Sequence, residues 1–238
     1  MDPDLPVVRL CVAGMQAEAE GRAERALELF QRAWEAAADD YEACIAAHYL
    51  ARQQLTPEET LRWNRECLDR ADRVGDARVQ AFYPSLYVNM AHAHQQLGQP
   101  APAHTYFVRA AQRVADASEG QYGDWNRFAI VEGLRRTGAA AGDTYGEGGA
   151  TGVDALPQPL EEELDARLRE LFSRWCARAD LKALGLTLPA YLGYLGTDQD
   201  RTRLRSALHM VHAARWLPDD EQAALETVIG AAALGAGN

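Results

Sequence analysis

The stretch GRAERALELFQRA, residues 21–33, returns with the same spacing of small and aromatic residues as GQPAPAHTYFVRA, residues 98–110. Each copy begins with glycine and then places alanine, phenylalanine and alanine four and three residues apart, as Ala26, Phe30 and Ala33 in the first copy. The copies lie 77 residues apart, which fits two units of roughly 34 to 43 residues better than one. Units of that length predict an all-α protein built from stacked helical hairpins.

A matching segment precedes each copy and supplies the first helix of its hairpin. Its members are Leu10, Ala13, Gly14 and Ala17 before the first copy, and Tyr87, Met90, Ala91 and His94 before the second. The small residues allow two helices to touch. The whole pattern resembles the tetratricopeptide repeat, over about residues 5–138. The resemblance implies a short solenoid that binds another protein or a peptide on its concave face.

Two further units are incomplete. Between the two good copies, a first helix is expected over 41–54, but Thr60 and Asn64 stand where the second helix of the family has alanine and an aromatic residue. A fourth first-helix is expected from about 125 to 136, ending at Gly138, without a second helix in the usual place. The sequence therefore predicts a degenerate solenoid over residues 1–137.

The rest of the chain is expected to form a linker and a second helical part. Residues 138–158 are rich in glycine and lack periodicity, which predicts a flexible linker. Residues 159–238 show apolar residues at helical spacing and predict a C-terminal α-helical bundle. We expect its first helix, after Pro159, to cap the last repeat, because a terminal repeat leaves an apolar face uncovered.

Charge and composition argue against several classes of function. The net charge of −11 and the pI of about 5.0 disfavour nucleic-acid and membrane partners, since phosphate contacts need a concentrated basic face. A helix-turn-helix reader with Arg201, Arg203 and Arg205 is a weaker alternative to a solvated arginine face. The chain start lacks the features of a secretion signal, and a cytoplasmic location is expected. Four cysteines without ligand spacing predict free thiols, with no metal and no cofactor.

The candidate site lies on first-helix residues that face away from the second helices. These residues are His48, His92 and Glu132, flanked by Arg52, Gln96, Arg135 and Arg136. In the degenerate unit the register is open by one residue, so that Tyr49 or Ala47 is an alternative to His48.

Three interpretations of this polar stripe stand beside one another. The arginines can hold a carboxylate of a bound peptide in bidentate geometry. A shared metal ion is the weakest interpretation, because neighbouring helix axes are roughly 8–10 Å apart. In the third interpretation, the groups are solvated or covered by the chain's own bundle.

The sequence favours a protein- or peptide-binding scaffold over an enzyme, since it contains no catalytic motif of known spacing. A small-molecule or peptide sensor, with the bundle as its responding element, is the first alternative. An unusual enzyme that uses the histidines is the second. A homo-oligomer remains open.

Overall fold

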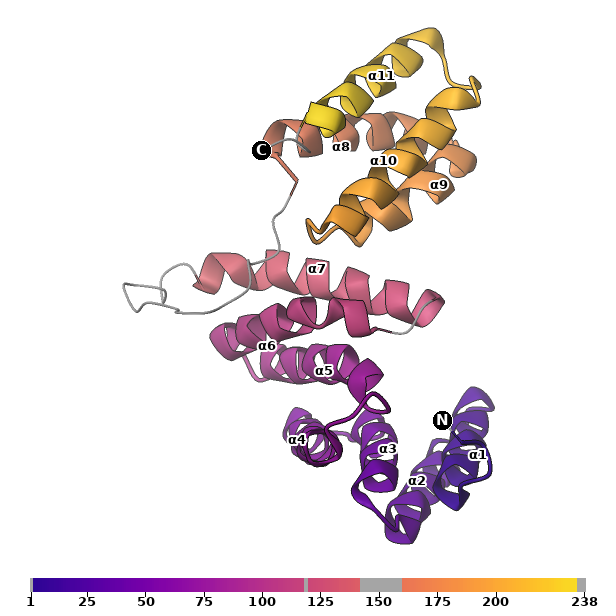
Figure 1. Cartoon of the computed structure of the whole chain (residues 1–238), viewed down its shortest axis with the longest axis vertical. Helices are drawn as coiled ribbons and strands as arrows, with labels where there is room; N and C mark the ends of the chain where they lie inside the picture. Colours follow the sequence, from indigo (N-terminus) through magenta and orange to yellow (C-terminus); the bar gives the residue numbers. More distant parts are fainter. Residues whose placement is uncertain (1, 118–119, 142–159, 235–238) are drawn as a thin grey trace. The chain divides into compact units, whose positions relative to one another are not determined.

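The computed structural model describes residues 2–117, 120–141 and 160–234 (Figure 1). Within these ranges every regular element is a helix, which confirms the predicted all-α fold. The chain divides into two units, Met1–Thr151 and Gly152–Asn238. We call them unit 1 and unit 2 and describe each by itself.

Unit 1 consists of successive antiparallel helix pairs. Its helices are α1 Pro6–Ala19, α2 Ala23–Ala36, α3 Asp40–Arg52, α4 Pro57–Val74, α5 Tyr83–Gln96, α6 Pro100–Gln112 and α7 Gln121–Ala141, with short 3-10 turns η1 Gln80–Phe82 and η2 Val114–Asp116. Each helix packs on the next, and in addition α1 contacts α3 and α5 contacts α7. We call the surface formed by these odd-numbered helices the inner face.

Two buried phenylalanines hold the hairpins together. Phe30 of α2 and Phe107 of α6 are both completely buried. A Cβ atom on Gly14 would lie 2.3 Å from Cε1 of Phe30, and one on Gly133 would lie 2.2 Å from Cζ of Phe107. Side chains in a close-packed core cannot move aside by that much. The absence of a side chain at these two glycines therefore sets the distance between the helices.

In the second hairpin, formed by α3 and α4, the larger contact residue lies on the first helix and the smaller one on the second, opposite to the other two hairpins. Gly14, His48 and Ala91 are buried, whereas Met15, Tyr49 and His92, which follow them, are only partly buried. His48 thus takes the place of the small residue. On the partner helix α4, the smaller, buried Asn64 stands where the other hairpins have phenylalanine. Of the positions that the sequence left open, Tyr49 is therefore the more exposed one, and His48 is buried.

The end of unit 1 also differs from the expectation. Helix α7 continues through Gly138 to Ala141, so the expected stop at Gly138 was wrong and the predicted linker begins too early. A glycine inside a helix costs only about 1 kcal/mol relative to alanine, and three alanines follow it here. The other linker residues, 142–158, lie outside the described residues, and the capping of the last repeat stays a prediction.

The described part of unit 2, residues 160–234, contains four helices. They are α8 Glu162–Ala177, α9 Leu181–Leu192, α10 Asp198–Ala213 and α11 Asp219–Leu234. Trp175 of α8, Leu208 of α10 and Leu225 of α11 are completely buried in their shared core. Helix α10 begins with a capping box of Thr197 and Asp200, in which each side chain accepts a backbone N–H. Among the described helices of both units, none has the length and apolarity needed to cross a membrane.

Candidate functional site

Four aromatic side chains of unit 1 form two groups, one on α7 and one around His48 of α3. Tyr122 and Trp125 of α7 stack on each other, with ring centroids 6.1 Å apart and an interplanar angle of 14°, and they are 49% and 47% exposed. Tyr49 of α3 and Phe82, at the end of η1, both pack edge-on against the ring of His48, with centroid distances of 5.5 and 5.4 Å. We call Tyr49, Phe82, Tyr122 and Trp125 the aromatic patch.

The ring of Tyr49 stacks on the buried ring of Phe30, with centroids 5.3 Å apart, and its phenol lies near groups on α1 and α7. Burial raises the pKa of its phenol, the neighbouring phenol of Tyr122 on α7 and the carboxylate of Glu18 on α1 raise it further, and Arg52 opposes them. Residues far apart in the sequence are therefore brought together here. Within the described part of the chain, the hydroxyls of Tyr49 and Tyr122 and the indole N–H of Trp125 have no hydrogen-bond partner. The patch thus presents three free donor groups.

Two of the three arginines predicted to bind a carboxylate, Arg52 and Arg136, have partners. Arg52 Nη2 lies 3.3 Å from a carboxylate oxygen of Glu18, and its guanidinium lies over the Tyr49 ring, 5.8 Å from the centroid. Arg136 Nη1 lies 3.7 Å from Glu132 Oε1. Such exposed pairs are worth about 1 kcal/mol or less. They nevertheless leave neither arginine uncompensated.

The predicted stripe is partly present in the structure. His92 lies close to both Glu132 and Arg136: burial lowers the pKa of its imidazole, Arg136 lowers it further and Glu132 opposes the shift. The structure thus places these three residues near one another, and their role in binding stays a prediction. Gln96 and Arg135 are exposed.

His48 does not belong to an exposed stripe. Its side chain is buried, and burial followed by the charge of Arg52 lowers the pKa of the imidazole to about 4. Nδ1 is buried and has no hydrogen-bond partner among the described residues. His48 is therefore a neutral packing residue beneath the patch, which corrects its predicted place in a binding groove.

An uncharged segment forms the middle of the inner face. No aspartate, glutamate, lysine or arginine occurs between Arg78 and Arg109, and this segment includes all of α5. Phe82, Asn89 and His92 are spaced seven and three residues apart and therefore fall on one side of the helix. The patch and this uncharged wall were missed from the sequence, although the absence of charge over thirty residues was visible there.

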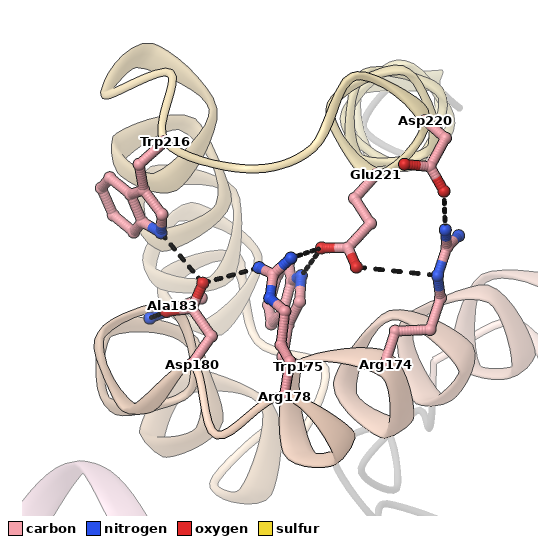
Figure 2. Close-up of polar contacts among 8 residues, drawn as sticks. All are labelled: Arg174, Trp175, Arg178, Asp180, Ala183, Trp216, Asp220 and Glu221. Carbon is pink, nitrogen blue, oxygen red and sulfur yellow. Dashed lines mark hydrogen bonds and ion pairs between the residues drawn. The ribbon is translucent and has the colours of Figure 1, made fainter.

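Unit 2 contains a second polar cluster, drawn in Figure 2. The carboxylate of Glu221 on α11 is almost fully buried and accepts hydrogen bonds from the indole N–H of Trp175, at 2.9 Å, and from Arg178 Nη1, at 2.9 Å. Arg174 lies between Glu221 and Asp220 and pairs with both. A buried carboxylate is stable only with such partners.

Asp180 extends the same cluster to the start of α9. One of its oxygens accepts the backbone N–H of Ala183, at 3.0 Å, and the other accepts Arg178 at 2.6 Å and the indole of Trp216 at 3.1 Å (Figure 2). Although burial raises the pKa of Asp180, these hydrogen bonds outweigh it and the net shift is downward. The cluster therefore joins α8, α9, α11 and the segment after α10, and its role is structural.

Helix α10 begins with a paired arginine and two acidic residues. Arg201 donates to the carbonyl of Gly196 and to Asp198, both at 2.6 Å. The first turn of the helix contains Asp198 and Asp200, which repel phosphate. No group of three His, Cys, Asp or Glu residues within the described ranges is placed to hold a metal ion.

No family model, no curated protein and no solved structure matches this chain. Its function therefore has to follow from its own residues. Of the two clusters, the inner face of unit 1 has free hydrogen-bonding groups and exposed aromatic surface, whereas the polar groups of the unit 2 cluster satisfy one another.

Proposed function

We propose that the chain is a tetratricopeptide-like binding protein, without catalytic activity of its own, that takes an extended segment of another protein on the inner face of unit 1. The observation that carries the proposal is the aromatic patch. Tyrosine and tryptophan are the residues most enriched at the energetic centres of protein interfaces, because they bury much area with little loss of side-chain entropy.

The exposure of the patch supports a binding role. Tyr122 and Trp125 stack on one another and leave about half of each side chain in water. Adjacent exposed apolar side chains of this size are usually covered by a partner. The free hydroxyl and indole donors beside them would pair with backbone carbonyls of a bound segment.

The length of the surface supports an extended ligand. The patch draws residues from α3, the end of η1 and α7, and His92 with the Glu132–Arg136 pair continues the inner face along α5 and α7. An extended chain rises about 3.3 Å per residue, so a few residues suffice to cross neighbouring helices. Such a protein acts by occupying its partner, as a scaffold or adaptor.

The test is site-specific photo-crosslinking in extract of the source cells. A photoreactive phenylalanine analogue replaces Tyr122 in one variant and Leu55 in the control, since Leu55 is 99% exposed on the turn between α3 and α4. We expect the Tyr122 variant to crosslink one discrete segment of a partner, identified by mass spectrometry, and the Leu55 variant to give none. Equal crosslinking at the two positions, or none at either, would contradict the proposal.

A further inference from the structure

Two buried cysteine sulfurs face each other across the second hairpin. Sγ of Cys44 on α3 lies 3.6 Å from Sγ of Cys67 on α4, and the Cys67 thiol donates to the carbonyl oxygen of Cys44 at 3.2 Å. Both side chains are completely buried. Within the described ranges, the other two cysteines, Cys11 on α1 and Cys176 on α8, have no sulfur this close. Cys44 and Cys67 therefore form a pair that joins the two helices of one hairpin.

The pair needs only a small movement to become a disulfide. The sulfur–sulfur bond is about 2.05 Å long, so the two Sγ atoms must approach by roughly 1.5 Å. The short distance from Cys67 Sγ to the backbone of Cys44 shows that the two residues lie opposite each other. The approach therefore calls for rotation of side chains rather than a rearrangement of the hairpin.

The surroundings of the pair give an oxidant a way to reach it. His48 follows Cys44 by four residues on α3, and Asn64 precedes Cys67 by three on α4, so each lies one helical turn from its cysteine. His48 Nδ1 and Asn64 Oδ1 are buried without a hydrogen-bond partner among the described residues. Unpaired buried polar atoms cost free energy that is regained when water reaches them. Local opening is therefore easier in this hairpin than in those closed by a phenylalanine.

We propose that Cys44 and Cys67 are a site of reversible oxidation, at which a peroxide converts the two thiols into a disulfide that locks α3 to α4. The inference is independent of the ligand of the inner face and goes beyond the proposed function.

The oxidation has two steps. In the opened hairpin, one thiol loses its proton to water and its sulfur attacks hydrogen peroxide; an S–O bond forms, the O–O bond breaks, and the departing hydroxide takes up a proton to become water. The second sulfur then attacks the resulting sulfenic acid. The S–S bond forms, the S–O bond breaks, and the leaving hydroxide takes the proton of the second thiol as another water. The two sulfurs together lose two electrons, which the peroxide gains.

The test treats the reduced full chain with hydrogen peroxide and counts the remaining thiols by maleimide labelling in denaturant and intact mass spectrometry. We expect two adducts after oxidation instead of four, and four again after treatment with dithiothreitol. Trypsin places the four cysteines on separate peptides, and the oxidised digest should contain peptide 33–52 joined to peptide 66–70. The oxidised protein should melt about 5–10 °C above the reduced protein, because the crosslink restricts the unfolded chain.

Variants assign the effect to this pair. Cys44→Ala should abolish both the joined peptides and the rise in Tm on oxidation. Cys11→Ala, which removes another buried thiol, should leave both unchanged. Far-UV circular dichroism verifies the fold of each variant, and the peptide map of the unaltered chain tests the proposal without any substitution.

The inference is overturned if all four thiols survive the peroxide, if the crosslink contains Cys11 or Cys176 instead, or if the two sulfurs gain oxygen without joining. Equal melting temperatures of the oxidised and reduced forms would overturn the proposed lock.

Discussion

Replacement of Gly133 by alanine tests the closest helix contact in unit 1. The new Cβ would lie 2.2, 2.3 and 2.4 Å from three atoms of the Phe107 ring, which is completely buried. Overpacking of this kind typically costs 1–3 kcal/mol. Because the Cβ meets three ring atoms at once, we expect the upper part of this range, about 2–3 kcal/mol. Alanine favours a helix over glycine by about 1 kcal/mol, which leaves a net loss of about 1–2 kcal/mol.

Gly138→Ala is the matched control on the same helix. Nothing lies within 4 Å of a Cβ built there, so only the helix preference remains and the variant should gain about 0.5–1 kcal/mol. The two substitutions are chemically identical and should change stability in opposite directions.

Differential scanning calorimetry measures the change, and hydrogen exchange with mass spectrometry assigns it to peptides of α6 and α7. For a unit of this size we expect the Tm of Gly133→Ala to fall by about 3–6 °C and that of Gly138→Ala to rise by a few degrees. Adding Phe107→Leu to Gly133→Ala should cost less than the sum of the two single changes, because the shorter side chain relieves the clash. The packing described for α6 and α7 is refuted if Gly133→Ala stabilises the protein as much as Gly138→Ala does.

Three further predictions concern buried groups. The folded-state pKa of His48, about 4, lies below its ordinary value of 6.5, so the unfolded chain binds more protons between these two values and the protein loses stability as the pH is lowered through this range. We expect the free energy of unfolding to decrease by about 2 kcal/mol from pH 7 to pH 5, and this decrease to be absent in His48→Gln. Equal shifts of the urea midpoint in the two proteins would exclude the prediction. Glu221→Gln should destabilise unit 2 by about 3 kcal/mol, since Trp175 and Arg178 lose the buried carboxylate that accepts from both. Asp220→Asn at an exposed pair should cost under about 1 kcal/mol in the same urea titration. Similar values for both would contradict the role given to the buried carboxylate. Burial raises the pKa of Cys11 to about 12 and that of Cys67 well above its usual range, so these thiols stay protonated and unreactive toward maleimide. Intact mass spectrometry should therefore show one maleimide adduct on the native protein, at exposed Cys176, and four adducts in denaturant. A second adduct on the native protein would mean that a buried thiol is accessible.

The all-α class was predictable because the helices of a hairpin pack through small and aromatic residues whose spacing of four and three residues can be read directly from the sequence. Ala26, Phe30 and their counterparts mark where two helices touch, and the structure buries them completely. The register of the second hairpin was not predictable in this way. There the bulky residue, His48, moved to the first helix and the smaller Asn64 to the second, so a search for small residues on the first helix selects the wrong neighbour.

The aromatic patch was hidden for a different reason. Tyr49, Phe82 and Tyr122 come from separate segments, and Phe82 belongs to a short turn outside the regular hairpins. They come near one another only once unit 1 is folded. The exposed pair Tyr122 and Trp125, by contrast, is separated by a single helical turn and is visible in the sequence.

The exchange of residues at matching positions gives the inner face a direction. Met15, Tyr49 and His92 each follow the buried contact residue of their own helix, yet they present a thioether, a phenol and an imidazole in that order. A strand laid across them meets a different chemical group at every step. In the proposed binding role, such a surface would distinguish a peptide running from its amino to its carboxyl end from the same peptide reversed, which a perfectly repeating surface would do only through the peptide backbone.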